Sequence, residues 1–255
     1  MPTTGADVIR EETYRRKLAW RGRGKTDLDR HVGGLDAEIE SRLARRQTVR
    51  ILELGCGYGA ALADLRARYG NRVELHGLNR VRHDGDAEVM LRNARERGLL
   101  PVDGAPPPDW LPTLHYGDVA QGLPFADRSF DLVCSQVAWL YFGDKINVLR
   151  HVMRVLDDDG LAKIDADELR PGLPAEYARL VEIWNGAALR SFGDYAGDFG
   201  VAFVPAASGE YLRFGKAPGF GADLDLALEI DLAQLNDHWD GIKCIYRLRP
   251  DGVAR

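Results

Sequence analysis

The run Val49-Arg50-Ile51-Leu52-Glu53-Leu54-Gly55-Cys56-Gly57-Tyr58-Gly59-Ala60 carries the strongest structural signal in this chain. A short apolar segment ends in an acidic residue, three alternating glycines follow, and an amphipathic segment continues from residue 61. The hydrophobic period therefore changes from that of a strand to that of a helix across the glycines. Glycine permits backbone dihedrals and close approaches that a side chain would block. Such a turn leaves unpaired N–H groups at the helix start, so we expect a nucleotide-sized site beyond the strand.

The glycines alone fit two classes of cofactor. Gly55, Gly57 and Ala60 match the dinucleotide fingerprint G-x-G-x-x-G/A, and Asn79-Arg80 at the end of the next predicted strand would suit a 2′-phosphate. The whole run, with its third glycine and its acid, resembles motif I of class I S-adenosylmethionine-dependent methyltransferases. In that family an E-x-G-x-G-x-G segment cradles the methionine end of the cofactor. The third glycine and the acid therefore favour a methyl donor over NADP, and the later motifs bear on the same choice.

Composition limits the possible functions. The 255 residues can bury a large core and fit one α/β domain with additions. A net charge of −5 and a pI near 5.7 give no global basic field, so no nucleic-acid partner is expected. Cys56, Cys134 and Cys244 have neither zinc-site nor disulfide-framework spacing, which favours a reducing cytoplasm and no metal site. No apolar run reaches membrane-spanning length, so no membrane segment is expected.

Two later segments strengthen the resemblance. The predicted strand TLHYGDV ends in Gly-Asp, as does the third cofactor motif of the family. By resemblance, Asp118 accepts the adenine amino group and the Val119 N–H meets a ring nitrogen. Leu123–Gln136 closely matches the L-P-F-x-D-x-S-F-D-x-V pattern that leads into the fourth strand. Its buried run places Ser135 and Gln136 at the strand's carboxyl end, beside the cofactor sulfur.

The resemblance covers residues 49 to about 165 and implies both a fold and a cofactor. The implied fold is α/β, with a doubly wound, seven-stranded, mostly parallel sheet, helices on both faces and an antiparallel last strand. The implied division is an N-terminal helical cap (1–47) and a Rossmann-like methyltransferase domain (48–255). The cofactor is S-adenosyl-L-methionine and its product is S-adenosyl-L-homocysteine. The residues expected to bind it are Glu53, Gly55, Cys56, Gly57, Gly59, Asn79, Arg80, Asp118, Val119, Ser135, Gln136 and Tyr14.

Two of these residues require comment. Asn79 stands where the family usually carries an acid that accepts from both ribose hydroxyls, and an amide should make a weaker contact. Tyr14 lies in the basic, aromatic segment 10–25, which we interpret as an amphipathic helix packed over the domain rather than as a nucleic-acid site. Class I enzymes often cover the cofactor with such a helix, from which a tyrosine or basic side chain meets the methionine carboxylate.

The remaining segments are assigned from their periodicity. Residues 27–46 and 174–190 are predicted as helices, and 224–231 and 241–248 alternate like the two strands that would close the sheet. Residues 191–223 are rich in glycine and aromatic side chains. They are expected to form either an insertion or lid over an acceptor pocket, or a surface excursion packed by its own aromatics.

The function implied by the resemblance is methyl transfer to an oxygen, nitrogen or carbon of a small molecule, such as a secondary metabolite. The sulfonium is already a good leaving group, so the protein mainly positions and desolvates the partners. A base is needed only if the acceptor loses a proton, and the candidates are His83, Tyr141 and His238. A lyase or cyclase using the same cofactor, a non-catalytic cofactor-binding partner and the disfavoured NADP-dependent reductase stay open. Monomer and homodimer stay open as well.

Overall fold

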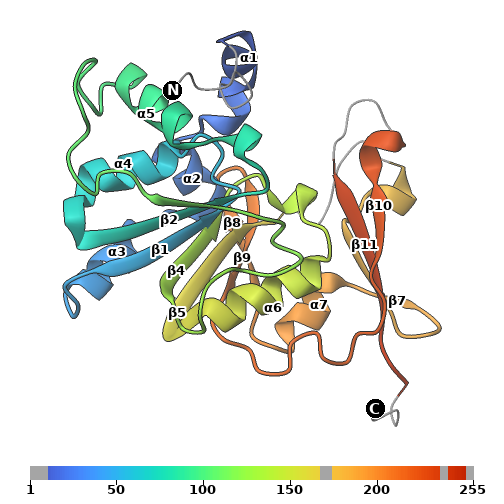
Figure 1. Ribbon diagram of the computed structural model, residues 1–255. Helices are drawn as coiled ribbons and strands as arrows, with labels where there is room; N and C mark the ends of the chain where they lie inside the picture. The colour runs from blue at the N-terminus through green and yellow to red at the C-terminus, as the bar shows by residue number, and fades with distance from the viewer. Residues whose placement is uncertain (1–10, 167–173, 236–240, 251–255) are drawn as a thin grey trace.

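A seven-stranded sheet forms the centre of the molecule in the computed structural model, which describes residues 11–166, 174–235 and 241–250 (Figure 1). Across the sheet its strands are β3 (Thr113–Tyr116), β2 (Val73–Asn79), β1 (Val49–Leu54), β4 (Phe130–Ser135), β5 (Leu156–Asp165), β9 (Gly209–Phe214) and β8 (Ala202–Ala206). The first five are parallel, whereas β9 is antiparallel to β5 and β8 is antiparallel to β9. The predicted doubly wound sheet with an antiparallel last strand is confirmed.

Helices cover both faces of this sheet. They are α1 (Glu11–Arg21), α2 (Lys25–Val32), α3 (Asp36–Leu43), α4 (Ala60–Tyr69), α5 (Ala87–Glu96), α6 (Lys145–Val155) and α7 (Phe192–Gly197). The two faces follow from strand alternation: Ile51 of β1 packs in a cluster with α2, α3 and α4, whereas Leu52 packs with α6 and α7. The helix predicted over 27–46 is divided into α2 and α3, because Gly33 ends α2 in a left-handed conformation at φ +70°.

A second, four-stranded sheet stands beside α6 and α7 (Figure 1). Its order is β10 (Leu228–Asp231), β11 (Ile242–Arg247), β6 (Val181–Trp184) and β7 (Leu189–Arg190), and β11 runs parallel to β6. Its inner side chains, among them Ile183 and Tyr246, are buried in the same cluster as α6. The second sheet therefore shares a hydrophobic core with the main sheet.

The assignment of the closing strands was wrong. The segments predicted at 224–231 and 241–248 do contain strands, β10 and β11, but these belong to the second sheet. The main sheet is closed by β8 and β9, a hairpin in which Ala206 pairs with Gly209 across a two-residue turn. Both strands lie within 191–223, the stretch expected as an insertion or lid, or as a surface excursion. Alternation identifies a strand but not its partner, and the glycine-rich composition hid the hairpin.

The helix predicted over 174–190 was also wrong. That stretch forms a short 3₁₀ turn (Ala175–Tyr177) and the strands β6 and β7. In β6, Val181 and Ile183 are buried while Glu182 and Trp184 face outward, which is a period of two. An apolar run this short fits the helix and strand periods equally well, so the sequence pattern misled.

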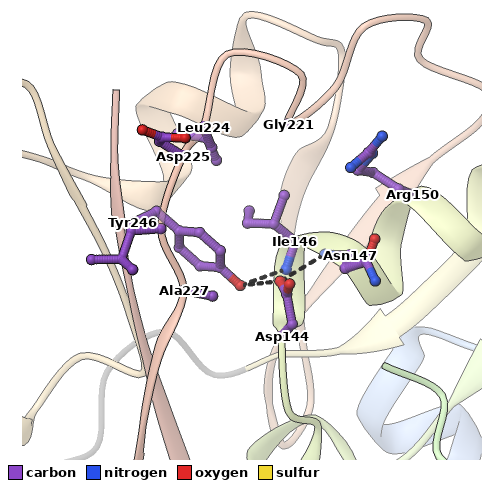
Figure 2. A pocket seen from close by; sticks show the side chains of 10 residues that line it. Asp144, Ile146, Asn147, Arg150, Gly221, Leu224, Asp225, Ala227 and Tyr246 are labelled. Carbon is purple, nitrogen blue, oxygen red and sulfur yellow. Dashed lines mark hydrogen bonds between the residues drawn. The ribbon is translucent and has the colours of Figure 1, made fainter. Parts of the chain in front are cut away.

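Tyr246 fastens the second sheet to α6 (Figure 2). Its hydroxyl donates to Asp144 Oδ1 at 2.7 Å and accepts from the Ile146 N–H at 3.0 Å. Asp144 in turn caps α6 by accepting from the Asn147 N–H at 3.1 Å. Burial raises the pKa of Tyr246, which keeps the hydroxyl protonated as a donor. The hollow beside this contact measures about 70 Å³, room for about two water molecules.

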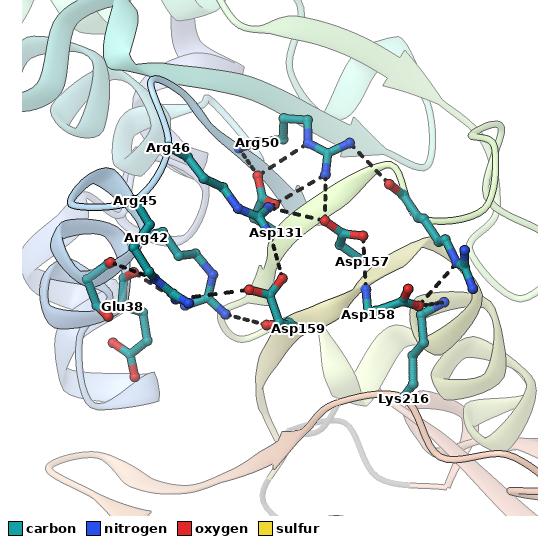
Figure 3. A network of polar contacts seen from close by, with 12 residues as sticks. Glu38, Arg42, Arg45, Arg46, Arg50, Asp131, Asp157, Asp158, Asp159 and Lys216 are labelled. Atoms are coloured by element: carbon teal, nitrogen blue, oxygen red, sulfur yellow. Dashed lines mark hydrogen bonds and ion pairs between the residues drawn. The ribbon is translucent and has the colours of Figure 1, made fainter.

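A network of arginines and aspartates joins the start of the strands β1, β4 and β5 (Figure 3). Asp131, fully buried, accepts from the Arg50 backbone N–H at 2.7 Å and from the Arg50 and Arg46 side chains. The carboxylate oxygens of Asp131, Asp157 and Asp159 lie within 4.8 Å of one another, and Arg46 contacts all three residues. The guanidinium groups thus supply the positive charge that holds the three carboxylates together.

No helix within residues 11–166, 174–235 and 241–250 has both the length and the apolar character needed to span a bilayer.

Candidate active site

A cavity of about 500 Å³ opens at the carboxyl ends of the parallel strands. It lies where the strand order reverses, since β1 pairs with β2 on one side and β4 on the other. Its volume is within the range of small-molecule sites. The lining residues are Lys17, Trp20, Arg21, Arg23, Gly55, Cys56, Gly57, Leu78, Asn79, Arg80, Asp84, Gly117, Asp118, Val119, Gln136, Val137, Ala138, Tyr141 and Phe142.

Most of the residues predicted to bind the cofactor come together here. Those on the cavity wall are Gly55, Cys56, Gly57, Asn79, Arg80, Asp118, Val119 and Gln136. They arise from four strand ends, which explains how residues so far apart in sequence meet. Asp118 is exposed beyond β3, where its Oδ1 accepts from the Ala120 N–H at 2.9 Å. Its role toward adenine stays a prediction.

The other predicted cofactor residues lie behind or beside the wall. Ser135 is buried and donates to the Leu54 carbonyl at 3.0 Å, so it ties β4 to β1. Gly59 sits under α5, where an added Cβ would lie 1.8 Å from Met90 Cε. Glu53 is buried beneath Gln136. Ser135 and Gly59 therefore support the loop rather than line the cavity, whereas Glu53 meets the cavity through its hydrogen bond with Gln136.

Tyr14 does not reach the cavity, and the structure corrects this expectation. Its ring is fully buried and stacks on Tyr58 at a centroid distance of 5.2 Å. Its hydroxyl donates to Glu96 Oε2 at 2.9 Å, so it holds α1 against α5. The helix does cover the site as expected, but through its last turn and the residues after it. We call residues 17–23 the strap; Lys17, Trp20, Arg21 and Arg23 of this segment line the cavity.

The strap rests directly on the glycine loop. The Tyr58 N–H donates to the Arg21 carbonyl at 2.7 Å. Gly57 has φ +54°, and a Cβ placed on it would lie 2.7 Å from the same carbonyl oxygen. Glycine is required at this position for both reasons, its dihedral and the close approach of the strap. The sequence motif thus serves the protein's own packing as well as the ligand.

Asn79 braces the loop from the other side. Its Oδ1 accepts from the Gly57 N–H at 2.8 Å, and its Nδ2 donates to the carbonyls of Gly57 (2.9 Å) and Gly85 (3.1 Å). The side chain is almost completely buried. Both amide donors and the oxygen are therefore engaged by backbone. An aspartate could not make the two donor contacts, which gives a physical reason for the amide at this strand end.

Glu53 and Gln136 form a buried polar pair at the base of the cavity. Gln136 Nε2 donates to Glu53 Oε1 at 3.0 Å. Burial raises the pKa of Glu53 to about 7. Glu53 Oε2 and Gln136 Oε1 are buried and receive no hydrogen bond from the described residues. Two unsatisfied acceptors next to the glycine loop suit a ligand that carries N–H donors.

The connection after β4 forms the apolar end of the cavity, with Val137, Ala138, Tyr141 and Phe142 on its wall. Val137 has φ +56°, an uncommon conformation for a β-branched residue. Its N–H donates to Asp165 Oδ2 at 2.8 Å, and His31 Nδ1 lies 3.3 Å from the same oxygen. This strained backbone is held by β5 and α2, as is typical of functional sites.

The three candidate bases fall in different places. Tyr141 lines the apolar end and is 54% exposed. His83 lies in a 3₁₀ turn (Arg82–Asp84) and is not on the wall; Arg21 Nη1 donates to its carbonyl at 2.7 Å. His238 lies outside the described residues. Of the described candidates, only Tyr141 borders the cavity.

The fold of this chain and one segment of its sequence resemble those of known proteins. The fold aligns with a Methanococcus maripaludis protein assigned as an S-adenosylmethionine-dependent methyltransferase, with a TM-score of 0.50, 14% identity, and coverage of 85% of this chain and 98% of that one. Residues 52–164 match the family model described as "Methyltransferase domain". Over the matched segment, sequence and fold thus agree with a class I S-adenosylmethionine-dependent methyltransferase domain. This confirms the resemblance on which the cofactor prediction depends.

Two curated relatives match part of this chain. Glycine/sarcosine/dimethylglycine N-methyltransferase of Actinopolyspora halophila is 32% identical over 133 residues, which are 52% of this chain and 20% of that protein. Aklanonic acid methyltransferase DauC of Streptomyces sp. (strain C5) is 29% identical over 136 residues, 52% of this chain and 56% of that protein. The chain thus spans about a fifth of the first relative and about half of the second.

The residues present fit the cofactor of this methyltransferase family, S-adenosylmethionine. Glu53 Oε2 and Gln136 Oε1 receive no hydrogen bond from the described residues. The ammonium group of the cofactor's methionine end carries N–H donors that suit these two oxygens. Asp118 lines the same cavity, and its carboxylate suits the adenine amino group as a hydrogen-bond acceptor. The strap residues were not named by motif reasoning; the only sequence signal for them was the basic, aromatic composition of residues 10–25.

Proposed function

We propose that this protein transfers the methyl group of S-adenosylmethionine to an oxygen, nitrogen or carbon of a small molecule. One observation carries the proposal: a single cavity is lined by the glycine loop, by Asp118 and by the apolar side chains of Val137, Ala138 and Phe142. A cofactor lying from Asp118 to the glycine loop would leave its sulfur facing that wall, where an acceptor has room. The names of both curated relatives describe methyl transfer to small acids, which supports a small-molecule acceptor.

The cofactor's sulfonium supplies an activated methyl group and leaves as a neutral thioether. The chain then has to orient the acceptor toward the methyl group and to exclude water from both reactants. The buried pair Glu53 and Gln136 would hold the methionine ammonium, and Asp118 the adenine. Tyr141, at the acceptor end, is the residue placed to take a proton if the acceptor must lose one. The strap and the connection after β4 would exclude water from opposite sides.

The test is calorimetric binding of S-adenosylhomocysteine to the wild type, Asp118→Ala and Asp103→Ala. Loss of a hydrogen bond between the carboxylate and the adenine amino group should raise the Kd of Asp118→Ala by roughly tenfold or more. Asp103, an exposed loop residue away from the cavity, serves as the matched control and should leave the Kd unchanged. Equal affinity of all three proteins would refute the adenine assignment. A wild type that binds no S-adenosylhomocysteine would refute the proposed function.

A further inference from the structure

The cavity carries more positive than negative side chains. Its charged wall residues are Lys17, Arg21, Arg23, Arg80, Asp84 and Asp118. Arg21 Nη2 pairs with Asp84 Oδ1 at 2.6 Å. In the described part of the chain, no carboxylate lies within 4.0 Å of the charged groups of Lys17, Arg23 or Arg80. Three cations thus face the cavity, and on its described wall Asp118 is the one carboxylate outside an ion pair.

The cofactor itself adds to this excess. S-adenosylmethionine carries a sulfonium, an ammonium and a carboxylate, and hence one net positive charge. Bringing it into a cationic cavity is costly unless a second ligand supplies negative charge, because desolvated like charges repel. After transfer the product S-adenosylhomocysteine has no net charge. A negative acceptor would therefore stabilise the complex before the reaction more than the complex after it, when the sulfonium is gone.

The position of Arg23 distinguishes it from the other cations. Gln136, directly after β4, donates to the Arg23 carbonyl at 3.5 Å, so this residue stands over the end of β4. Arg21 instead lies on the glycine loop through its carbonyl, and Arg80 follows β2, toward the ribose side. Arg23 is thus the cation next to the apolar connection at 137–142. Its Nη1 donates to the Trp20 carbonyl at 2.7 Å, and among the described residues the guanidinium has no second acceptor, which leaves its other donors for a ligand.

We infer that the methyl acceptor is an anion, carrying a carboxylate or a group of like charge, and that Arg23 of the strap binds it. This inference rests on the proposed function and adds the chemical class of its second substrate. Arginine presents two parallel N–H donors to a carboxylate, which gives orientation as well as attraction. Trp20, which is 64% exposed on the same wall, offers an apolar surface beside the charge. An acid with an adjacent apolar body matches this combination.

The experiment uses the full chain saturated with S-adenosylhomocysteine and three pairs of probes: glycolate, alanine and salicylate, each compared with its primary amide. Calorimetry at constant ionic strength gives the ratio of amide Kd to acid Kd for each pair. At least one acid should bind about tenfold or more tightly than its amide. Arg23→Gln should reduce that ratio to near one, and Arg23→Lys should restore part of it. Lys17→Gln removes the same charge from another part of the wall and should keep the ratio.

Each outcome decides between the possibilities. Equal binding of acids and amides, or no binding of any acid, overturns the inference while S-adenosylhomocysteine binding still supports the proposed function. An equal loss of the ratio in Lys17→Gln and Arg23→Gln overturns the assignment to Arg23, because it would show that the overall positive charge of the cavity, and not one contact, attracts the acid. If S-adenosylhomocysteine itself does not bind, the proposed function fails first. Retained S-adenosylhomocysteine binding by Arg23→Gln shows that the variant is folded.

Discussion

Asn79 makes two hydrogen bonds to a single residue, Gly57: its Oδ1 accepts from the Gly57 N–H at 2.8 Å, and its Nδ2 donates to the Gly57 carbonyl at 2.9 Å. The end of β2 is thereby fixed to the glycine loop after β1. A backbone residue held at both of its polar groups has little freedom left. The loop is therefore positioned by the protein itself rather than by its ligand.

Asn79→Asp should destabilise the protein although it restores the acid common at this position in the family. The carboxylate would face the carbonyls of Gly57 and Gly85 without a donor, a change of about 1–3 kcal/mol in the free energy of unfolding. S-adenosylhomocysteine affinity should fall with it. Urea unfolding and calorimetry check both. Asn71→Asp is the control, because Asn71 Oδ1 accepts from Arg66 and an acid there keeps its partner. A more stable or tighter-binding Asn79→Asp would contradict the bracing role.

The pKa of Glu53 predicts a pH effect on stability. Burial raises that pKa from 4.5 to about 7, so the folded protein holds the proton more tightly than the unfolded chain does. The resulting stabilisation is complete below pH 4.5 and is lost as the pH rises through 7, with a slope of at most about 1.4 kcal/mol per pH unit. Glu53→Gln should flatten this part of the stability profile, whereas the exposed Glu88→Gln should not. Superimposable profiles for wild type and Glu53→Gln would disprove the assignment.

The same titration should change cofactor affinity. Ionised Glu53 offers a charge to the ligand's ammonium, so S-adenosylmethionine should bind more tightly as the pH rises from 6 to about 7.5. Calorimetry across this range measures the trend. In Glu53→Gln the trend should be absent over the same interval. A wild-type Kd that stays constant through neutral pH would show that the ammonium lies elsewhere.

Gly57→Ala should separate the strap from the glycine loop. The new Cβ would lie 2.7 Å from the Arg21 carbonyl oxygen, and the residue would keep a φ of +54° that alanine adopts at a cost of about 1 kcal/mol or more. We expect loss of S-adenosylhomocysteine binding and faster proteolysis after Arg21 or Arg23. Gly197→Ala is the control, because nothing lies within 4 Å of its added Cβ. Normal binding by Gly57→Ala would place the ligand away from the loop.

The arginine–aspartate network should affect stability and leave binding unchanged. Asp131 is fully buried and bonds Arg46 and Arg50, so Asp131→Asn should cost about 3 kcal/mol of unfolding free energy. Asp158 pairs with Arg128 at the exposed end of the same network, and Asp158→Asn should cost less than about 1 kcal/mol. Both should bind S-adenosylhomocysteine as the wild type does, since neither residue lies on the cavity wall. An equal loss of unfolding free energy in Asp131→Asn and Asp158→Asn would show that burial does not determine the strength of these ion pairs.

The sequence predicted the parallel strands and the loops at their carboxyl ends, because each of these loops carries a recognisable motif. The glycine run, Gly117-Asp118 and the strand before Ser135 all lie where the resemblance placed them, because parallel strands end at one edge of the sheet. It did not predict which strands pair with each other. The alternation of buried and exposed residues around Ile183 and Cys244 indicates a strand with one buried face. This alternation does not specify the sheet to which the strand belongs.

The site was predictable only where residues act through the motif. The motif indicates Gly57 and Asn79, and both lie on the cavity wall. It gives no reason for the amide of Asn79, because this amide binds backbone groups that only the folded loop brings near. Arg23 lies in no motif, and the irregular segment that carries it has no period. Tyr14 was chosen over the strap because a buried tyrosine and a ligand-binding one look alike in sequence.

In the second sheet, β6 lies against β11, although the whole β8–β9 hairpin separates them along the chain. All seven strands of the main sheet precede β10 and β11 in sequence. During synthesis the strands of the main sheet therefore leave the ribosome before β11 does, and the edge of β6 that pairs with β11 stays open until then. An open strand edge is a site for pairing with other chains, so this edge is the one the nascent protein has to protect.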